Sequence, residues 1–156
     1  MVKNILVTGG AGYVGSPFVG LLLSNNYNVV VVDNLSFGGD SLLNIWHHPN
    51  FKFIKGDITS LDFIETVFKD NKIEAVVHLA AIVGDPACAK QPELARKVNW
   101  EASMNLLDLS VRNGAKRFIF ASTCSNYGKM SGSNGYVKET SPLAPVSLYA
   151  ELKVKF

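Results

Sequence analysis

Five short runs of apolar residues, rich in β-branched and aromatic side chains, recur along the chain and predict β-strands. They are 4–8 (NILVT), 28–33 (NVVVVD), 51–56 (FKFIKG), 75–80 (AVVHLA) and 117–122 (RFIFAS). Several runs are apolar on both faces, which is typical of a parallel sheet with helices on both sides.

The longer segments between these runs show helical spacing. Apolar residues fall on one face within 13–24 and 61–69, while 92–113 begins with proline at a first-turn position and ends at Asn113-Gly114, a helix-stop signal. Alternating strands and helices indicate βαβ units with right-handed crossovers. The sequence therefore predicts an α/β fold, a Rossmann-type doubly wound parallel sheet with helices on both faces. A Gly/Ser/Asn-rich segment, 128–135, is predicted to be a long loop.

Composition narrows the class of protein without identifying a function. The 156 residues are 47% hydrophobic and 18% charged, which is typical of one globular domain. The net charge of +2, with scattered Lys and Arg, gives no footprint for nucleic acid or an anionic membrane. No apolar stretch reaches the roughly 20 residues of a membrane span, and residues 1–8 lack the features of a signal peptide. Cys88 and Cys124 have neither metal-site nor disulfide-scaffold spacing. We expect a cytoplasmic protein with reduced thiols and no metal.

A glycine-rich turn follows the first predicted strand. Residues 10–15 (GAGYVG) match the dinucleotide-binding pattern G-x-G-x-x-G, and Gly9, Gly12 and Gly15 match its close variant. Glycine permits positive φ, close approach of the backbone to a pyrophosphate and tight packing of helix on strand. The helix that follows offers N–H groups and a partial positive charge to phosphates. The pattern is weak alone, but its place between a strand and a helix makes it specific.

Asp33 ends the second predicted strand, about 20 residues after the turn. A carboxylate there accepts hydrogen bonds from the adenosine ribose hydroxyls and repels a 2′-phosphate. No Arg follows Asp33 closely. We therefore predict NAD rather than NADP as the cofactor. A structural turn followed by a solvated carboxylate is the alternative interpretation.

Tyr149 and Lys153 lie four residues apart in LYAELK, so a helix places them on one face. A nearby ammonium lowers the pKa of a phenol from about 10 toward the range of a general acid/base. A surface pair with a snorkelling lysine is the alternative.

The segment 120–128 (FASTCSNYG) leaves the last predicted strand at its carboxyl end, where ligands bind in open α/β sheets. Its hydroxyls are placed to reach the same substrate oxygen as Tyr149. A hydroxyl-bearing turn, a Tyr and a Lys are together the groups that move a proton while a nicotinamide takes or gives hydride.

In these motifs the chain resembles the extended short-chain dehydrogenase/reductase family, the nucleotide-sugar epimerases, dehydratases and reductases. The matching segments are TGGAGYVGS (8–16), DNLS (33–36), GDI (56–58), HLAA (78–81), Asn99, STCSNYG (122–128) and YAELK (149–153). They occur in the family's order over nearly the whole chain.

The resemblance implies a role for each matching residue. Tyr149 is the catalytic acid/base, Lys153 tunes it and binds the nicotinamide ribose, and Thr123, four residues before Tyr127, carries the catalytic hydroxyl. Asn99 supports the site. The implied NAD-binding residues are Gly9, Gly12, Tyr13, Val14, Gly15, Asp33, Asn34, Asp57, Ile58, Leu79, Ala80, Ala81, Asn99, Ser122, Tyr149 and Lys153, with Asp57 and Ile58 at the adenine.

The resemblance also implies a reaction on a UDP-, GDP-, CDP- or dTDP-sugar. In a reaction like that of UDP-glucose 4-epimerase, Tyr149 removes the C4 hydroxyl proton as NAD takes the hydride, and the 4-keto sugar rotates before the hydride returns. Similar 4,6-dehydratases carry Asp-Glu directly after the catalytic Thr, whereas this chain has Cys124 and Ser125. Dehydration is therefore disfavoured, and a 4-keto-sugar reductase or another epimerase stays open.

Two side chains near these motifs receive no catalytic role. His78 lies in an apolar strand, where a satisfied core histidine is expected. Nothing near Cys124 marks it as a nucleophile with a lowered pKa.

In the family, the helix with the Tyr-Lys pair continues for several turns and a substrate-binding domain follows. We therefore expect 1–156 to be an incomplete NAD-binding Rossmann domain, the N-terminal portion of a longer enzyme and inactive alone. Because a short helix end is poorly held, we also expect Tyr149 and Lys153 to be frayed.

Three functions stay open. The first is a nucleotide-sugar epimerase or reductase, a homodimer at full length. The second is a non-catalytic NAD-binding module. The third is a structural subunit that pairs through exposed helices, since 92–113 resembles the family's dimer-forming helix and carries Trp100 and Met104; core packing explains those two residues equally well.

Overall fold

Helices and strands alternate along the chain in the computed structural model, which describes residues 3–128 and 136–156. The strands are β1 (Asn4–Thr8), β2 (Asn28–Asp33), β3 (Phe51–Lys55), β4 (Ala75–His78) and β5 (Arg117–Phe120). The α-helices are α1 (Gly15–Ser24), α2 (Leu61–Asn71), α3 (Asp85–Lys90), α4 (Pro92–Arg96), α5 (Ser103–Arg112) and α6 (Leu148–Lys155). The other helical elements are the 3-10 helices η1 (Asp40–Ile45) and η3 (Cys124–Tyr127) and the π-helical η2 (Lys97–Ala102). Of the predicted loop 128–135, all but Gly128 lies outside the described residues.

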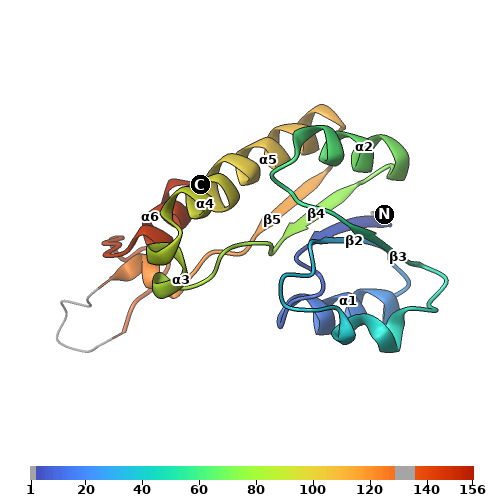
Figure 1. The fold of residues 1–156 in the computed structure, drawn as a ribbon, viewed down its shortest axis with the longest axis horizontal. Coiled ribbons are helices and arrows are strands. Elements are labelled where there is room, and N and C mark those ends of the chain that lie inside the picture. The colour runs from blue at the N-terminus through green and yellow to red at the C-terminus, as the bar shows by residue number, and fades with distance from the viewer. Residues whose placement is uncertain (1–2, 129–135) are drawn as a thin grey trace. The chain divides into compact units, whose positions relative to one another are not determined.

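The described strands form one parallel sheet in the order β3-β2-β1-β4-β5. Thr8, the last residue of β1, pairs with Val32 of β2 and with His78 of β4. Helix α1 lies on one face of the sheet, and α2 and α5 lie side by side on the other (Figure 1). The strand order reverses between β1 and β4, so their carboxyl ends form the switch point at which such sheets bind ligands. This arrangement confirms the predicted Rossmann-type fold.

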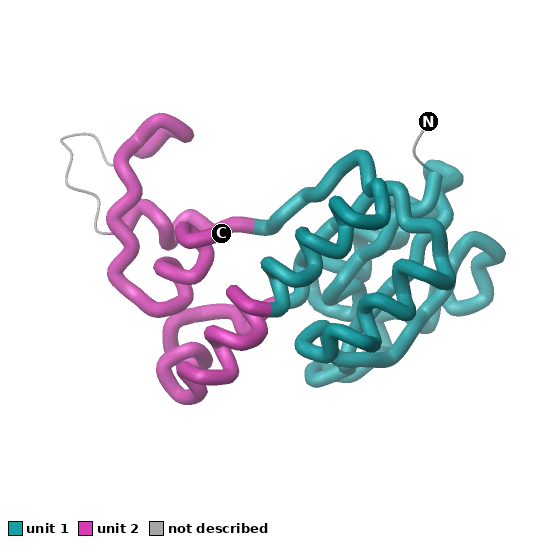
Figure 2. Tube along the Cα trace, turned by 90° about the horizontal axis from the view of Figure 1, so that it is seen from above, with its two compact units in different colours: residues 1–80, 102–121 teal, residues 81–101, 122–156 magenta. Residues whose placement is uncertain are grey.

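The contacts divide the chain into two compact units, coloured separately in Figure 2. One, called here the sheet unit, comprises residues 1–80 and 102–121. The other, called the helical unit, comprises residues 81–101 and 122–156. The composition predicted one domain, whereas the contacts within the described residues form these two units.

The core of the sheet unit follows from its β-branched strands. Residues 29–32 of β2 are all buried, so this strand is covered on both faces as its apolar run predicts. Val19 and Leu23 of α1, one helical turn apart, pack against the core cluster that contains Val7 and Val31. The core thereby fixes the carboxyl ends of the strands, from which the candidate site is built.

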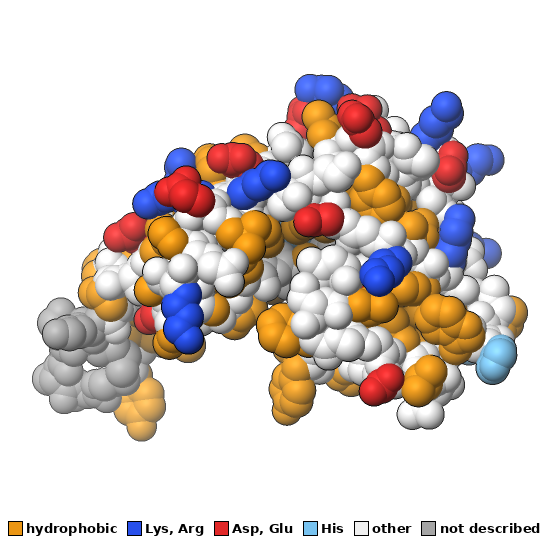
Figure 3. Space-filling model, in the orientation of Figure 1, with side chains coloured by type: hydrophobic (Ala, Val, Ile, Leu, Met, Phe, Trp, Pro, Cys, Tyr) orange, Lys and Arg blue, Asp and Glu red, His pale blue; other side chains and the backbone are white. Residues whose placement is uncertain are grey.

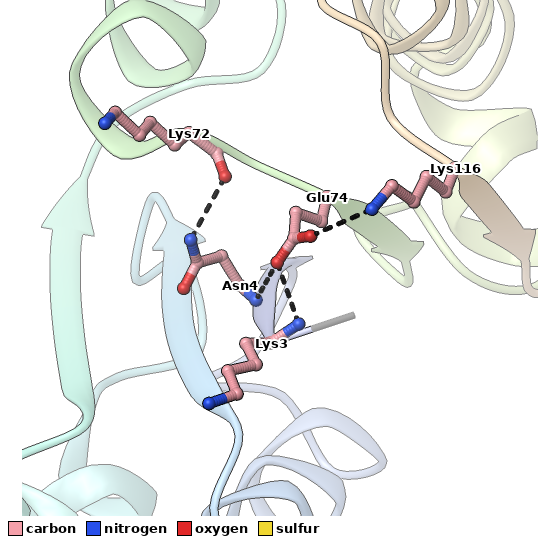
Figure 4. Close-up of polar contacts among 5 residues, drawn as sticks. All are labelled: Lys3, Asn4, Lys72, Glu74 and Lys116. Atoms are coloured by element: carbon pink, nitrogen blue, oxygen red, sulfur yellow. Dashed lines mark hydrogen bonds and ion pairs between the residues drawn. The ribbon is translucent and has the colours of Figure 1, made fainter. Parts of the chain in front are cut away.

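Glu74 holds together the opposite, amino-terminal ends of three strands. Its carboxylate accepts hydrogen bonds from the backbone N–H groups of Lys3 at 2.8 Å and Asn4 at 3.2 Å, and from Lys116 Nζ at 3.3 Å (Figure 4). These bonds, that of Lys3 foremost, lower the pKa of Glu74. Glu74 thus serves the fold rather than the site.

The predicted helix over 92–113 is helical over most of that range but not uniform. It begins at Pro92 and ends at Arg112, as the proline and the Asn-Gly signal predicted. Between α4 and α5 the π-helical η2 carries Asn99 and Trp100. A π-turn is wider than an α-turn, and such segments are frequent at functional sites.

The surface shows no strong charge of one sign on the face drawn in Figure 3, where basic and acidic side chains are interspersed. This agrees with a net charge of +2. Within the described ranges, every helix is too short or too polar to cross a membrane.

Candidate functional site

The glycine-rich turn after β1 is packed too closely for side chains at Gly9, Gly10 and Gly15, and at the first and last of these a Cβ would meet backbone. Gly9 has a φ of +74°, and a Cβ there would lie 2.6 Å from the Ala80 nitrogen and 2.8 Å from its Cα. A Cβ on Gly15 would overlap the Gly9 carbonyl oxygen and lie 2.7 Å from the Gly10 Cα. Since unbonded carbon atoms normally stay farther apart, glycine is required at both positions. The tight packing of helix on strand expected from the glycine pattern is present.

Asp33 fastens this turn to the end of β2. Its Oδ2 accepts a hydrogen bond from the Ala11 N–H at 3.0 Å, and its Oδ1 accepts one from the Leu35 N–H at 2.8 Å. The Ser41 hydroxyl of η1 donates to the Ala11 carbonyl at 2.7 Å. The carboxylate therefore lies beside the glycine-rich turn, where the sequence analysis placed a ribose-binding acid.

The other predicted NAD-binding residues of the sheet unit also follow strand ends. Asn34 is exposed directly after β2; Asp57 is exposed and Ile58 buried shortly after β3. The N–H of Leu79, after β4, donates to the Thr8 carbonyl at 3.1 Å. Ala81 belongs to the helical unit.

Tyr13 and Val14, both predicted to bind NAD, have exposed side chains at the start of α1. Their side chains are 97% and 62% exposed, and Val14, the N-cap of α1, makes no side-chain capping bond. At the start of α1 the Ser16 N–H donates to the Gly12 carbonyl at 3.0 Å and Pro17 has no N–H, so this helix end attracts an anion through the positive end of the helix dipole. The positive end of α1, glycines that admit close approach and a carboxylate one strand away together fit a dinucleotide.

In the helical unit, α6 carries the predicted catalytic pair. Tyr149 and Lys153 are both buried, and Tyr149 packs in a cluster with Cys88, Ala95 and Leu152. The expectation that this pair is frayed is therefore wrong. Packing against α3 and η3 holds α6 although the helix is short.

A side-chain cap fixes the start of α6. Ser147 Oγ accepts a hydrogen bond from the Ala150 N–H at 3.3 Å and donates to Asp85 Oδ1 at 2.6 Å. The cap thus ties α6 to the first residue of α3.

Replacing Ser147 by Ala removes both of these bonds. The free energy of unfolding is expected to fall by about 1 kcal/mol, the usual value of a lost helix cap. Chemical denaturation followed by circular dichroism measures it. The matched control is Ser60→Ala, because Ser60 is the N-cap of α2 but makes no side-chain capping bond. Equal losses in the two variants would contradict the assigned cap.

Thr123, which comes before η3, lies beside Tyr149 in the helical unit. Thr123 is the N-cap of η3, where its Oγ1 accepts the Ser125 N–H at 3.2 Å, and its side chain is near enough to the Tyr149 phenol to lower the pKa of that group. Ser122 Oγ accepts from Asn126 Nδ2 at 2.8 Å. The structure thus brings together Thr123 and the α6 pair, the three residues predicted to be catalytic.

Burial controls the protonation of this group. Desolvation raises the pKa of the Tyr149 phenol, and the side chain of Thr123 opposes that rise. Burial also lowers the pKa of Lys153 to about 8, while its Nζ lies 6.0 Å from the Tyr149 ring centroid. The expected lowering of the Tyr149 pKa by Lys153 is thus not found, because burial raises that pKa. Lys153 is instead a lysine whose charge changes near neutral pH.

Replacing Lys153 by Met tests this burial. In the folded state the lowered pKa makes protonation costly, so the Met variant should gain between about 1 and 3 kcal/mol of unfolding free energy at pH 7. Between the folded pKa of about 8 and the unfolded value of about 10.4, the wild type binds fewer protons folded than unfolded. Its stability therefore rises with pH, and the difference from the variant should shrink. Lys90→Met, at an exposed position of the same unit, is the control; a pH-independent difference for Lys153→Met would refute the interpretation.

Asn99 braces the segment that follows β4. Its Oδ1 accepts the Ile82 N–H at 2.8 Å and its Nδ2 donates to the Ile82 carbonyl at 2.9 Å. Cys88 Sγ donates to the same carbonyl at 3.3 Å. Asn99 therefore fixes the backbone of Ile82, and its role in the site stays a prediction.

The sequence analysis missed Ser147 and Asp85 as members of this group. Asp85 raises the pKa of Tyr149 through its charge and holds the cap of α6. The signals available were the Gly84-Asp85-Pro86 run, which marks a helix start, and Ser147, a favoured N-cap residue. Among the described residues no group of His, Cys, Asp or Glu is arranged to hold a metal ion.

Comparison with known proteins gives a consistent result. The model of the NAD dependent epimerase/dehydratase family matches residues 5–156. A UDP-glucose 4-epimerase of Lacticaseibacillus casei is 36% identical over 151 residues, which are 97% of this chain and 44% of that protein.

Solved structures agree with this match. The UDP-Glc/GlcNAc 4-epimerase of Campylobacter jejuni superposes with a TM-score of 0.91 at 32% identity, over 97% of this chain and 46% of that one. The Thermus thermophilus UDP-glucose 4-epimerase, solved with NAD, gives a TM-score of 0.88 at 31% identity, over 98% and 48%. The chain thus spans less than half the length of these relatives.

Proposed function

Since the chain belongs to the NAD dependent epimerase/dehydratase family, we propose that it forms the cofactor-binding and catalytic portion of a nucleotide-sugar 4-epimerase. NAD is the cofactor of this family and UDP-sugars are named for the relatives above. The observation that carries the proposal is the buried pair Tyr149 and Lys153 with the half-buried Thr123 beside the phenol, in a chain that also has a dinucleotide turn.

The sheet unit holds the cofactor in this proposal. The first turn of α1 binds the pyrophosphate, Asp33 binds the adenosine ribose, and Asp57 and Ile58 contact the adenine. Asp33 favours NAD because a 2′-phosphate beside its carboxylate would be repelled. Bound NAD supplies a hydride acceptor and donor, and the proton chemistry falls to the protein.

The helical unit moves the proton. Tyr149, ionised at the moment of reaction, accepts the proton of the sugar C4 hydroxyl and later returns it to the C4 oxygen. Thr123 donates a hydrogen bond to the same oxygen and so stabilises charge that develops there. Protonated Lys153 favours the phenolate, an effect that burial strengthens because a low-dielectric site enhances the attraction.

A 4-keto-sugar reductase is the second candidate, and the same residues support it. Dehydration is less well supported, because the residues after Thr123 are Cys124 and Ser125, and neither is an acid at neutral pH. An epimerase returns the hydride that it takes and needs only catalytic NAD. A reductase consumes one NADH for each sugar.

The test is turnover by the whole product of the gene that encodes this chain. UDP-glucose and UDP-N-acetylglucosamine are incubated with substoichiometric NAD, and the sugars are followed by proton NMR. The proposal predicts the C4 epimer at equilibrium with no net NADH. Stoichiometric NADH consumption on a 4-keto sugar would establish the reductase, and loss of water would establish a dehydratase. No turnover by folded protein, with NAD bound, would support the non-catalytic binding module.

We also propose that the whole protein is a cytoplasmic homodimer. Met104 and Val111 of α5 are 38% and 69% exposed, which suits pairing of this helix with a second copy. Cys88 and Cys124 are free thiols, as in a reducing compartment. A monomeric sedimentation profile at high concentration would count against the dimer.

A further inference from the structure

A buried polar chain crosses the sheet unit from α5 to the glycine-rich turn. Thr8 Oγ1 lies 2.6 Å from His78 Nδ1, and His78 Nε2 lies 2.8 Å from Ser103 Oγ. The three residues are at most 1% exposed. A hydroxyl can donate or accept, so both ring nitrogens are satisfied in either neutral tautomer.

This row of hydrogen-bonded side chains ends at Thr8, where the glycine-rich turn meets the segment that follows β4. Thr8 immediately precedes Gly9, and its Oγ1 accepts a hydrogen bond from the Ala80 N–H at 3.5 Å. The Gly9 Cα is so near the Ala80 backbone that a Cβ would lie 2.6 Å from the Ala80 nitrogen. The glycine-rich turn and the segment after β4, both proposed to hold NAD, therefore touch at Gly9 and Ala80. The Thr8 side chain is hydrogen-bonded to Ala80 at this point of contact.

His78 fixes the orientation of the Thr8 side chain. The threonine hydroxyl has three staggered positions, and the 2.6 Å contact to Nδ1 selects one of them. The ring itself is held by Ser103 and by Phe118 and Phe120 of β5, whose ring centroids lie 6.2 Å and 5.9 Å away. A buried apolar side chain would fill the space but would leave the Thr8 rotamer unspecified.

We propose that His78 is a positioning residue for NAD binding. His78 acts through Thr8 to fix the Gly9–Ala80 contact, and this contact shapes the pyrophosphate-binding turn. This inference rests on the proposed binding of NAD. It goes beyond the core role expected for His78, because it assigns the Nδ1 contact to cofactor binding and the Nε2 contact to anchoring the ring.

The two ring nitrogens can be tested separately. In His78→Asn the side-chain amide occupies the place of Nδ1 and keeps the link to Thr8, whereas in His78→Gln the amide reaches the place of Nε2 and keeps the link to Ser103. Titration calorimetry of the chain with NAD is expected to show about tenfold weaker binding for His78→Gln and for Thr8→Val, as for a lost buried hydrogen bond. His78→Asn should stay within about twofold of wild type.

Thermal unfolding supplies the control for a purely structural role. Both His78 variants lose one buried contact and should lose similar stability, so their difference in NAD affinity cannot come from stability. Ser110→Ala is the matched control for buried hydroxyls on α5, because Ser110 Oγ donates only within its own helix, to the Leu106 carbonyl at 2.6 Å. That variant should bind NAD like wild type.

Amide hydrogen exchange tests the proposal even if NAD fails to bind. Exchange at the Ala80 N–H should accelerate in His78→Gln, although Thr8 is intact, and should remain near wild type in His78→Asn. NAD affinities that fall equally in the two His78 variants, or fall in neither, would overturn the proposal, as would equal Ala80 exchange. Failure of wild-type chain to bind NAD would instead refute the proposed function.

Discussion

Replacing Tyr149 by Phe is expected to lower sugar turnover by about a thousandfold, the usual contribution of a positioned general acid/base. The phenol is buried in the helical unit beside the side chain of Thr123, and Phe at this position has no oxygen to take up a proton. Phe keeps the ring that packs with Cys88 and Leu152. The variant should therefore fold while it loses the proton acceptor.

The measurement is the epimerisation rate of the whole gene product at saturating UDP-sugar, with NAD affinity measured alongside. Tyr136→Phe is the control, because that phenol is 93% exposed and lies in the same unit; it should keep the wild-type rate. Retention of more than about a tenth of the wild-type rate by Tyr149→Phe would place the acid/base elsewhere.

Gly15→Ala should abolish most NAD binding. The added Cβ would overlap the Gly9 carbonyl oxygen and lie 2.7 Å from the Gly10 Cα, so the backbone of the turn must move. We expect about a hundredfold weaker binding and a loss of about 2 to 4 kcal/mol of unfolding free energy. Calorimetric titration with NAD and chemical denaturation measure the two effects.

Two further glycine variants distinguish an effect on NAD binding from an effect on the stability of the fold. At Gly20, also in α1, a Cβ meets nothing within 4 Å, so Gly20→Ala should bind NAD normally and gain about 1 kcal/mol of stability. At Gly12, a Cβ approaches only the Gly9 carbonyl oxygen, at 3.3 Å, so Gly12→Ala should fold yet bind NAD less tightly. Wild-type affinity in both Gly12→Ala and Gly15→Ala would show that NAD does not lie on this turn.

Much of the sheet could be predicted because its signals are local. Strands β1 and β2 have the predicted bounds, since an apolar run that ends at a glycine turn or an acid leaves little choice. The predicted strands at 75–80 and 117–122 end two residues early. Leu79 and Ala80 are apolar for another reason, because they pack against the glycine-rich turn rather than continue the ladder.

The helical unit was harder to predict because its order comes from packing between segments distant in sequence. Ser147 bonds to Asp85 across 62 residues, so the sequence near α6 gives no sign of that anchor. The π-helical η2 was not predicted, because the spacing of apolar residues over 92–113 does not reveal one wider turn within a helix. The pKa of Tyr149 was misjudged because the spacing to Lys153 is visible in the sequence and the burial of both is not.

The central claim is that this chain binds NAD through its glycine-rich turn and Asp33, and calorimetric titration with NAD and with NADP tests it most directly. The account predicts a saturable NAD isotherm with one site, and NADP binding at least about tenfold weaker, because the Asp33 carboxylate repels a 2′-phosphate. Asp33→Asn should narrow that difference. No NAD binding by folded chain, or NADP binding as tight as that of NAD, would contradict the account.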